Sequence, residues 1–473
     1  LKVYAIREGD VVFSRVPMIR VEGPVAMCQL IETTLLNCVN FASLIATNAA
    51  RMREAVIGKK PIQMLEFGLR RAQGPDGAMS ASQYAYLGGF DSTSNVLAGI
   101  NYDIAISGTH AHSFVTTFSS LDQLQFVNPK IQCKDGKDLK TRAVEYRKLL
   151  NEEESSNEGE LTAFIAYANA FPTHFLALID TYNTLDSGLI NFMSVALALH
   201  EAKCEPIGVR LDSGDLSYLS QKCREYFRRV SQQFQVPFEN LTIVASNDIN
   251  EEILYSLNVC LLIDWLVDAF GIGTNLVTCQ KQPALGCVYK LVAIDGLARI
   301  KISEEIGKMT LPGTKSAYRL YIHNNEPLID LLVLDDEANE SPTEKKKSRS
   351  LLEAKQVIRC YHPSNDLKRV DVVPDRIEPL LIKVQNDNMQ KKKNSLRKEK
   401  LEKEDERVWD GKLVYKSPSL KERRAFCMER VKTLRSDYKR VVNPTPYKVS
   451  ISKKLKDVMK DLIEKETPVR TIQ

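Results

Sequence analysis

Six short apolar segments within residues 63–288 constrain the fold of this chain more than any other feature of its sequence. Each segment is followed at once by polar or small residues, and most are then followed by a stretch in which apolar side chains recur at helical spacing. Strands that alternate with helices in this way form parallel sheets. We therefore expect six parallel strands, at residues 64–67, 104–106, 175–179, 207–211, 241–245 and 266–270.

The turns after these strands hold most of the residues that can carry chemistry. In a parallel barrel the carboxyl ends of all strands meet on one face, and such barrels bind their ligands there. One pocket built from six turns is therefore the natural prediction. Its candidate residues are Arg70, Arg71, Thr109, His110, His112, Asp180, Asp212, Asp215, Ser246, Gly271, Gly273 and Thr274.

Residues 64–115 are the densest part of this pattern. They contain two adjacent arginines and two histidines that are two positions apart. Residues 91–95 place hydroxyl and carboxyl groups directly before an apolar helix start, where free backbone N–H groups suit an anion. The combination predicts a phosphate or carboxylate ligand and a functional histidine. From the residues alone, the alternative is a basic surface loop beside a pair of histidines that binds no metal.

Short alternating segments occur at residues 2–22 and again beyond residue 290, and they predict strands of a smaller domain. We expect residues 1–24 to belong to this β-rich domain and residues 25–288 to form an α/β barrel. Residues 289–473 would hold the strands that complete the small domain, charged insertions and C-terminal helices. The charge-dense stretches 341–350 and 386–407 are typical of solvated insertions, with a nuclear signal or an acidic partner as the alternative.

The composition argues against several other classes of protein. A chain of 473 residues that is 44% hydrophobic can bury the cores of two or three domains. The net charge of +5 is small and no basic stripe is interleaved with aromatic residues, so we expect no nucleic-acid partner. Ten cysteines without a Cys-x-x-Cys pair argue for reduced thiols in a reducing compartment. No run of eighteen apolar residues predicts a membrane span.

Several short motifs of the sequence are similar to those of one enzyme family. They are EFGLRRAQGPDG at residues 66–77, GGFDS at 88–92, GTHAHS at 108–113, RLDSGD at 210–215, SN at 246–247 and GIGT at 271–274. In this order they resemble nicotinate phosphoribosyltransferase of the animal type, over most of the chain up to about residue 335. The resemblance implies the irregular α/β barrel of the type II phosphoribosyltransferases, with a smaller β-rich α+β domain from the N- and C-terminal parts.

The resemblance also implies a reaction in the salvage route to NAD. Nicotinate and 5-phosphoribosyl-1-diphosphate would form nicotinate mononucleotide and pyrophosphate, with ATP hydrolysis coupled through a phosphohistidine. Mg²⁺ or Mn²⁺ on the pyrophosphate, and carboxylates near the ribose, would lower the barrier as a cationic ribosyl centre develops. The family implies a cytosolic homodimer with a shared active site. A preceding N-terminal portion of the family, with an aromatic residue that packs on nicotinate from the neighbouring subunit, has no match here.

Roles in substrate binding carry over residue by residue. By the resemblance, Arg210 covers the pyridine ring, Thr109 contacts nicotinate and Arg70 faces the phosphates. Stacking of a guanidinium on an aromatic ring contributes roughly 0.5–2 kcal/mol. Phe67 would form the other side of the ring slot, or else a core position. Glycine lets backbone N–H groups approach an anion closely, which predicts a phosphate grip from Gly271, Gly273 and Thr274.

Carboxylates and one histidine complete the predicted site. Asp180, Asp212 and Asp215 suit ribose hydroxyls, and Asp212 and Asp215 suit Mg²⁺; the alternative for all three is a helix N-cap. His112 is the predicted phosphate acceptor, because a neutral imidazole can attack the γ-phosphorus of ATP and this histidine lies in the family word AHS. His110 is its competitor, and a purely structural histidine is the alternative.

Ser94 bears on the choice between acid and amide. The nicotinamide-using relative has an aspartate at the position that matches Ser94, and a carboxylate about 4 Å from nicotinate would cost on the order of 4 kcal/mol at an effective dielectric constant of about 20. An uncharged Ser94 therefore favours nicotinate. Two rivals stay open: a relative that uses nicotinamide or quinolinate, and a truncated non-catalytic subunit. The family has a short polar turn where this chain has the apolar run 259–267. This run could extend the strand or shift the register of the turn that holds Thr274.

Overall fold

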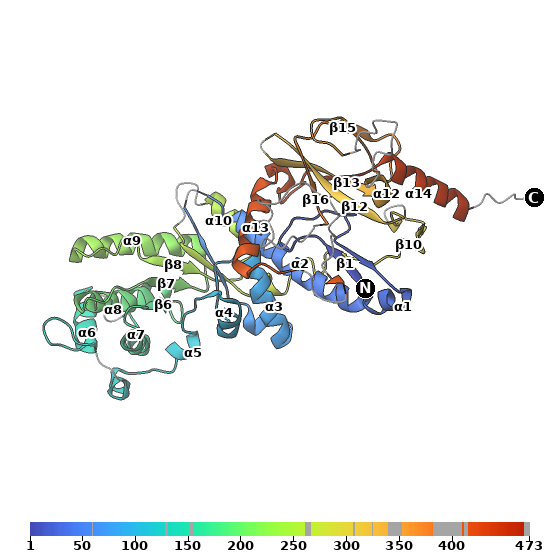
Figure 1. Ribbon diagram of the computed structural model, residues 1–473. Helices are drawn as coiled ribbons and strands as arrows, with labels where there is room; N and C mark the ends of the chain where they lie inside the picture. Colours follow the sequence, from blue (N-terminus) through green and yellow to red (C-terminus); the bar gives the residue numbers. More distant parts are fainter. Residues whose placement is uncertain are drawn as a thin grey trace, which may run out of the picture. The chain divides into compact units, whose positions relative to one another are not determined.

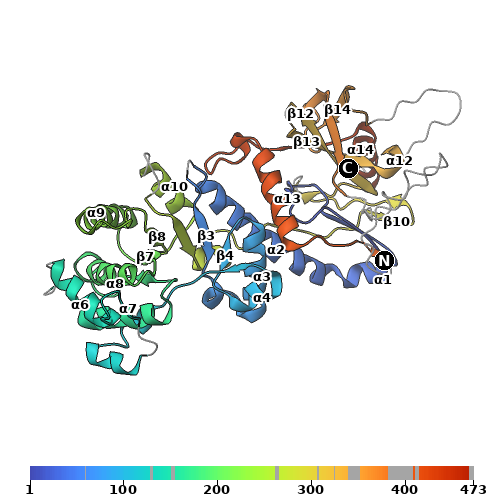
Figure 2. The same ribbon diagram turned by 60° about the vertical axis from the view of Figure 1, so that its left-hand side comes forward.

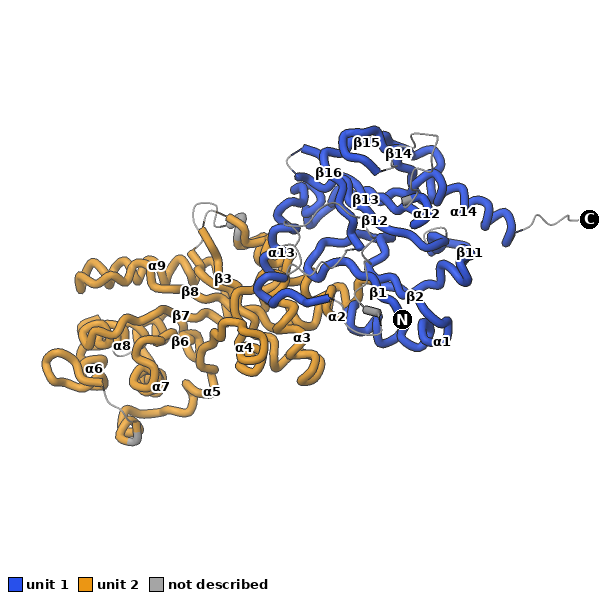
Figure 3. Tube along the Cα trace, in the orientation of Figure 1, with its two compact units in different colours: residues 1–40, 286–473 blue, residues 41–285 orange. Residues whose placement is uncertain are grey.

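The computed structural model describes residues 1–58, 60–127, 131–150, 155–260, 266–305, 308–323, 325–338, 352–381, 409–410 and 415–467. The chain divides into two compact units (Figure 3). Unit 1 comprises Leu1–Asn40 and Gly286–Gln473, so both ends of the chain belong to it, and unit 2 comprises Phe41–Leu285. The charge-dense stretches 341–350 and 386–407, and residues 261–265 of the apolar run, lie outside the described residues.

Unit 2 is built on a parallel sheet of seven strands that curls into a half-barrel (Figure 1). The strand order is β5-β4-β3-β9-β8-β7-β6, so β5 and β6 are the two edges. The strands are β3 (Gln63–Glu66), β4 (Ser92–Thr93), β5 (Ala105–Ile106), β6 (Leu176–Leu178), β7 (Gly208–Leu211), β8 (Thr242–Ala245) and β9 (Ala269–Ile272).

Helices alternate with these strands along the chain. Helices α3 and α4 lie beside β3 and β4, and α8 and α9 lie beside β6 to β8 (Figures 1 and 2). The helical elements are α2 (Glu32–Ala55), η1 (Leu69–Arg71), α3 (Gly74–Leu87), α4 (Val96–Tyr102), α5 (His112–Val115), η2 (Leu121–Phe126), α6 (Leu139–Leu149), α7 (Glu158–Ala170), the π-helical turn η3 (Thr184–Gly188), α8 (Leu189–Glu201), α9 (Leu216–Phe234), α10 (Glu251–Cys260) and α11 (Thr274–Val277).

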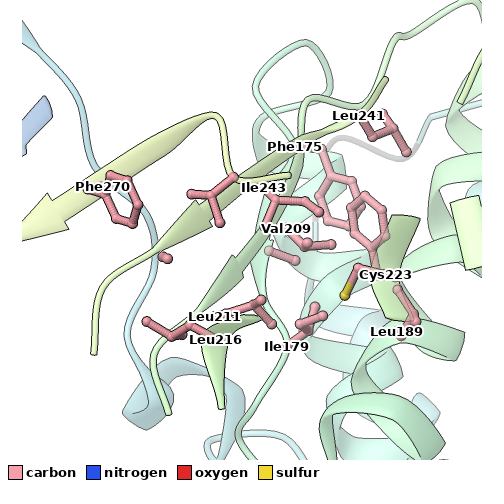
Figure 4. Close-up of a cluster of buried hydrophobic side chains, with 14 of the residues drawn as sticks. Phe175, Ile179, Leu189, Val209, Leu211, Leu216, Cys223, Leu241, Ile243 and Phe270 are labelled. Atoms are coloured by element: carbon pink, nitrogen blue, oxygen red, sulfur yellow. The ribbon is translucent and has the colours of Figure 1, made fainter. Parts of the chain in front are cut away.

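The expected class, an α/β barrel of parallel strands, is confirmed. All six expected strands are present within a few residues of their predicted limits. The seventh, β4, was not predicted, because its two residues are both polar and precede a helix. Strand side chains alternate between faces, and those on the outer face pack with the helices in one buried cluster. Figure 4 shows part of it, which includes Phe175, Val209, Leu211 and Ile243 from the sheet and its entry, and Leu189 and Cys223 from α8 and α9.

Unit 1 is strand-rich, as expected for the smaller domain. Its main sheet has the order β15-β14-β18-β13-β12-β16, a second sheet has the order β17-β1-β2, and β10 pairs with β11. The strands are β1 (Lys2–Ala5), β2 (Ile19–Glu22), β10 (Ala293–Ile294), β11 (Leu297–Ala298), β12 (Lys315–Ile322), β13 (Glu326–Leu334), β14 (Ile358–Tyr361), β15 (Arg369–Val372), β16 (Arg376–Pro379), β17 (Trp409–Asp410) and β18 (Lys448–Ile451). The helices are α1 (Val25–Leu30), α12 (Asp335–Ala338), α13 (Leu420–Thr433), η7 (Ser436–Tyr438) and α14 (Lys453–Glu466).

The helical stretch from α1 through α2 is divided between the two units. Residues 25–40, which we expected at the start of the barrel domain, cluster with unit 1, and the remainder of α2 clusters with unit 2. By length and composition alone, Val25–Ala55 could cross a membrane, as many core helices could. Its most apolar part is 11% buried, whereas Leu44, Ile45, Ala49 and Met52 of α2 lie in the core of unit 2.

Candidate active site

The alternation of strand side chains places the functional groups on the inner face of the curled sheet. On β7, Val209 and Leu211 are buried among the helices, so Arg210 between them projects from the opposite face. The same face carries a small apolar cluster, in which Phe67 packs against Leu65, Val244 and Ala269. The inner face is therefore apolar at its base, and it carries a cation where β7 ends.

Arg210 is held in place by three hydrogen bonds. Its Nε donates to Ser246 Oγ at 2.7 Å, one terminal nitrogen donates to Thr109 Oγ1 at 2.9 Å, and the other donates to Asp212 Oδ1 at 2.8 Å. Because a guanidinium has five N–H donors, two of them, one on each terminal nitrogen, have no hydrogen-bond partner among the described residues. Arg210 is thus an oriented cation, 14% exposed, with donors available to an anion.

Phe67 lies directly against this guanidinium. The guanidinium carbon of Arg210 is 5.2 Å from the centroid of the Phe67 ring. A planar ligand between the two groups would need about 7 Å, since each stacked contact takes about 3.5 Å. The predicted slot between Phe67 and Arg210 is therefore closed. Gly271 permits this arrangement, because a Cβ at that position would lie 2.5 Å from the Phe67 ring.

His112 is the first residue of α5 and is 43% exposed. Its Nδ1 lies 3.1 Å from Thr181 Oγ1. Its Nε2 lies 3.5 Å from Asp212 Oδ2 and 3.9 Å from Asp180 Oδ1. Asp212 therefore contacts the predicted cation, Arg210, through one oxygen and the predicted acceptor histidine through the other. The structure brings both groups into a single site.

Asp180 is buried behind His112, with only 1% of its side chain exposed. Its Oδ2 accepts a hydrogen bond from the Ser213 hydroxyl, and its buried Oδ1 has no hydrogen-bond partner among the described residues. A second carboxyl group, Glu160 of α7, is near enough for the charge of Asp180 to affect it. Burial raises the pKa of Glu160 to about 7; hydrogen bonds from Ser187 and Asn191 oppose this shift, and Asp180 adds to it.

Two further predicted residues use their side chains inside the fold. Asp215 is the N-cap of α9, where it accepts the Tyr218 N–H at 3.0 Å, as in the alternative interpretation of this aspartate. Ser94 donates its hydroxyl to the Glu66 carbonyl at 3.2 Å, in the turn between β4 and α4. Neither side chain approaches His112 or Arg210 through a hydrogen bond described in the structure.

The remaining predicted phosphate contacts lie at strand ends. Arg70 is exposed in η1, after β3. Gly273 and Thr274 are partly exposed where β9 passes into α11. Helix α11 has only four residues, so its dipole adds little to the field that we expected at this turn.

Comparison with known proteins shows the family of this chain. The model of the nicotinate phosphoribosyltransferase (NAPRTase) family matches residues 62–339, and the model of the nicotinate phosphoribosyltransferase C-terminal domain matches residues 314–398 and 382–459. Nicotinate phosphoribosyltransferase of Dictyostelium discoideum is 48% identical over 472 residues, covering 100% of this chain and 74% of that protein. The chain belongs to the nicotinate phosphoribosyltransferase family.

Two further similarities extend this result. Human nicotinate phosphoribosyltransferase is 40% identical over 474 residues, covering 98% of this chain and 80% of the human protein. The crystal structure of human nicotinic acid phosphoribosyltransferase superposes with a TM-score of 0.78 at 37% identity, covering 98% of this chain and 82% of that one. Nicotinate-nucleotide pyrophosphorylase from Pyrococcus furiosus, with a TM-score of 0.56 at 21% identity over 91% of this chain and 80% of that one, shares the fold.

Several residues of this phosphoribosyltransferase site were not predicted individually. Thr181 and Ser213, which were not among the candidates, contact His112 and Asp180, and Ser246, a candidate with no assigned role, holds both Arg210 and Asp212. All three lie in the polar turns after strands, so their position was a usable signal. Glu160 gave no such signal, because it lies in α7, outside the strand turns.

A divalent ion fits part of this site. Among the described residues, no three His, Cys, Asp or Glu side chains are grouped closely enough to hold a metal. Mg²⁺, however, is usually held by one or two carboxylates together with phosphate oxygens and waters. The unpartnered Oδ1 of Asp180 and the Oδ2 of Asp212, both beside His112, suit an ion that arrives with a diphosphate. Asp215 suits it less, because one of its oxygens caps α9.

Proposed function

We propose that this chain is an ATP-dependent nicotinate phosphoribosyltransferase of NAD salvage, which forms nicotinate mononucleotide and pyrophosphate from nicotinate and 5-phosphoribosyl-1-diphosphate. The observation that carries the proposal is the shared carboxylate of Asp212, which joins the Arg210 guanidinium to His112 at the end of the sheet. The family relationship supplies the substrate class.

Arg210 would recognise the acid. Its two remaining N–H donors can bind a carboxylate, and hydrogen bonds between two charged groups are roughly twice as strong as neutral ones. Because Phe67 and Arg210 touch, the pyridine ring would lie beside this pair rather than between its members. Thr109 would then act by orienting Arg210, in addition to any contact with nicotinate. Ser94 carries no charge, so it would not repel the carboxylate of nicotinate.

Asp180 and Asp212 would serve the ribosyl centre. As pyrophosphate leaves, positive charge develops on the ribosyl carbon, and two adjacent carboxylates stabilise it in a partly buried site. Mg²⁺ or Mn²⁺, when bound with the diphosphate, would offset the charge of the leaving group. Arg70, Gly273 and Thr274 would contact phosphate oxygens from the neighbouring strand ends.

His112 would accept the γ-phosphoryl group of ATP. The carboxylates near Nε2 favour a proton on that nitrogen, which leaves Nδ1 unprotonated for attack on phosphorus while ADP leaves. Thr181, which now contacts Nδ1, would have to release it.

We also propose a cytosolic homodimer with shared active sites. Four apolar side chains on α4 and β5, close in sequence to Ser94 and Thr109, are at least half exposed: Val96 55%, Leu97 57%, Ile100 71% and Ile106 50%. Exposed apolar groups of this kind mark contact surfaces. Nine of the ten cysteines are free thiols, which is usual in a reducing compartment.

The test is turnover by the purified full chain. We expect pyrophosphate release with nicotinate and 5-phosphoribosyl-1-diphosphate, stimulated by ATP, and little release with nicotinamide or quinolinate. Arg210→Ala should lower kcat/KM for nicotinate by about 100-fold or more. It removes the two proposed charge-assisted hydrogen bonds to the nicotinate carboxylate, of about 1.5–3 kcal/mol each. Arg228→Ala, at an exposed arginine of α9, is the matched control.

The rival functions predict different results. A preference for nicotinamide or quinolinate would replace the proposed substrate. A chain that is inactive alone but active when mixed with a full-length relative would be a non-catalytic subunit.

A further inference from the structure

The loop between β5 and α5 crosses from one edge of the sheet to the other. Strands β5 and β6 are opposite edges and do not pair. Even so, three residues of this loop and of the start of α5 contact the β6 and β7 side: Thr109 accepts from Arg210, His110 from the Leu178 N–H, and His112 meets Thr181. Side chains, not strand pairing, therefore link the two edges here.

The His110 side chain joins this loop to the backbone of β6. Next to Leu178, the Ile179 N–H donates to the Arg210 carbonyl of β7. Successive N–H groups of a strand point to opposite sides, so the Leu178 N–H points away from β7, to the open edge. There it donates to His110 Nε2 at 3.2 Å. The imidazole takes the place of a missing neighbouring strand.

The surroundings of His110 keep it neutral. The ring packs against Tyr167, Phe114 and Phe164, with centroid distances of 4.9, 5.5 and 6.0 Å. Burial lowers the pKa of His110 to about 4, which the adjacent Ala111 backbone opposes in part and the positive Arg210 reinforces. A proton on Nε2 would also face the Leu178 N–H, donor against donor. Accepting that bond requires the tautomer with its proton on Nδ1.

The same contact sets the position of His112. Two residues after Leu178 comes Asp180, and two residues after His110 comes His112; Asp180 Oδ1 and His112 Nε2 are 3.9 Å apart. A shift of the loop along β6 would separate this second pair together with the first.

We propose that His110 is a positioning residue: as the neutral Nδ1–H tautomer it binds the Leu178 N–H at the open edge of β6 and thereby holds His112 in register with Asp180. This inference rests on the proposed function only where it concerns catalysis. It also removes His110 as a competitor for the phosphoryl group, because its Nε2 lone pair is engaged and its Nδ1 is buried, with no hydrogen-bond partner among the described residues.

The experiment uses the full chain and three variants. His110→Phe keeps an aromatic ring in the pocket but removes the acceptor. His110→Gln returns an acceptor oxygen. His174→Phe makes the matched change at an exposed histidine of the same unit. Three quantities are measured: the protonation of the His110 ring nitrogens by ¹⁵N NMR, the acid-labile phosphate that ATP places on His112, and kcat and KM for nicotinate.

We expect the wild-type spectrum to show a neutral His110 with its proton on Nδ1 at pH 7. His110→Phe should lower kcat and the labelling rate of His112 about tenfold, the loss expected when one buried N–H is left without a partner, with less than about twofold change in KM. His110→Gln should recover part of the loss, and His174→Phe should match the wild type.

Three results would overturn the inference: a proton on Nε2 of His110, a His110→Phe variant that labels and turns over like the wild type, or phosphate found on His110. If the wild type shows neither turnover nor label, the proposed function fails. The NMR measurement needs no activity and still decides the tautomer on which the inference depends.

Discussion

Glu160 gives the sharpest electrostatic prediction. Its side chain is completely buried in unit 2, and its Oε2 accepts hydrogen bonds from Ser187 and Asn191. Burial raises its pKa from 4.5 to about 7. The difference between these values, at 1.36 kcal/mol per pKa unit, is about 3 kcal/mol. That is the free energy by which ionised Glu160 disfavours the folded state relative to protonated Glu160.

Proton linkage makes the contribution of Glu160 to stability depend on pH. A carboxyl group whose pKa is raised on folding contributes stability that is fully present below its unfolded pKa of 4.5 and is lost as pH rises through about 7. Glu160→Gln replaces the group with an uncharged one of the same shape, whose oxygen can still accept from Ser187 and Asn191. The stability of the variant relative to wild type should therefore increase by about 3 kcal/mol between pH 4.5 and pH 8.

The assay has to follow unit 2 specifically, since a chain of two compact units need not unfold in one step. Hydrogen exchange of the α7 amides in increasing urea, at several pH values, reports the unfolding free energy of that region. Glu158→Gln, an exposed carboxylate in the first turn of the same helix, should run parallel to wild type. Unfolding free energies of wild type and Glu160→Gln that change in parallel between pH 4.5 and pH 8 would contradict the raised pKa of Glu160.

Three further predictions concern the site and its support. Ser94→Asp should lower kcat/KM for nicotinate by about a thousandfold, because the new carboxylate would repel that of nicotinate by about 4 kcal/mol. The kcat/KM for nicotinamide should fall far less, and parallel assays with the two substrates check this. Gly271→Ala should displace Phe67, whose ring lies 2.5 Å from the new Cβ, and raise KM for nicotinate at least about tenfold with an unchanged circular dichroism spectrum. Glu66→Ala should lower the unfolding free energy of unit 2 by about 3 kcal/mol or more, because the buried carboxylate accepts from the Gly68 N–H and from two buried hydroxyls; denaturant titration measures the loss, and Glu66→Gln should lose less.

The fold was largely predictable because apolar strands followed by amphipathic helices leave few alternatives to a parallel sheet. The sequence pattern failed at β4, because its two residues, which pair with β3 and β5, are both polar and form no apolar run. It also failed at the start of α2, because helical periodicity does not reveal which unit a helix packs against.

The site was predictable in part for the same reason. Arg210 and Asp212 are two positions apart at a strand end, so their shared face follows from the strand period. The contact between Thr109 and Arg210 depends on how far the loop after β5 reaches across an open edge, which no local pattern encodes. Asp215 has the residue type and position of a ligand and of a helix cap alike, and only the structure shows its bond to the Tyr218 N–H.

A crystal structure of the chain with nicotinate bound tests the central claim most directly. The account predicts the carboxylate of nicotinate within hydrogen-bond distance of the two N–H groups that Arg210 has left, with the pyridine ring beside Phe67 and its nitrogen directed towards Asp180 and Asp212. Nicotinate bound away from the carboxyl ends of the strands, with Arg210 still engaged only by Ser246, Thr109 and Asp212, would contradict it.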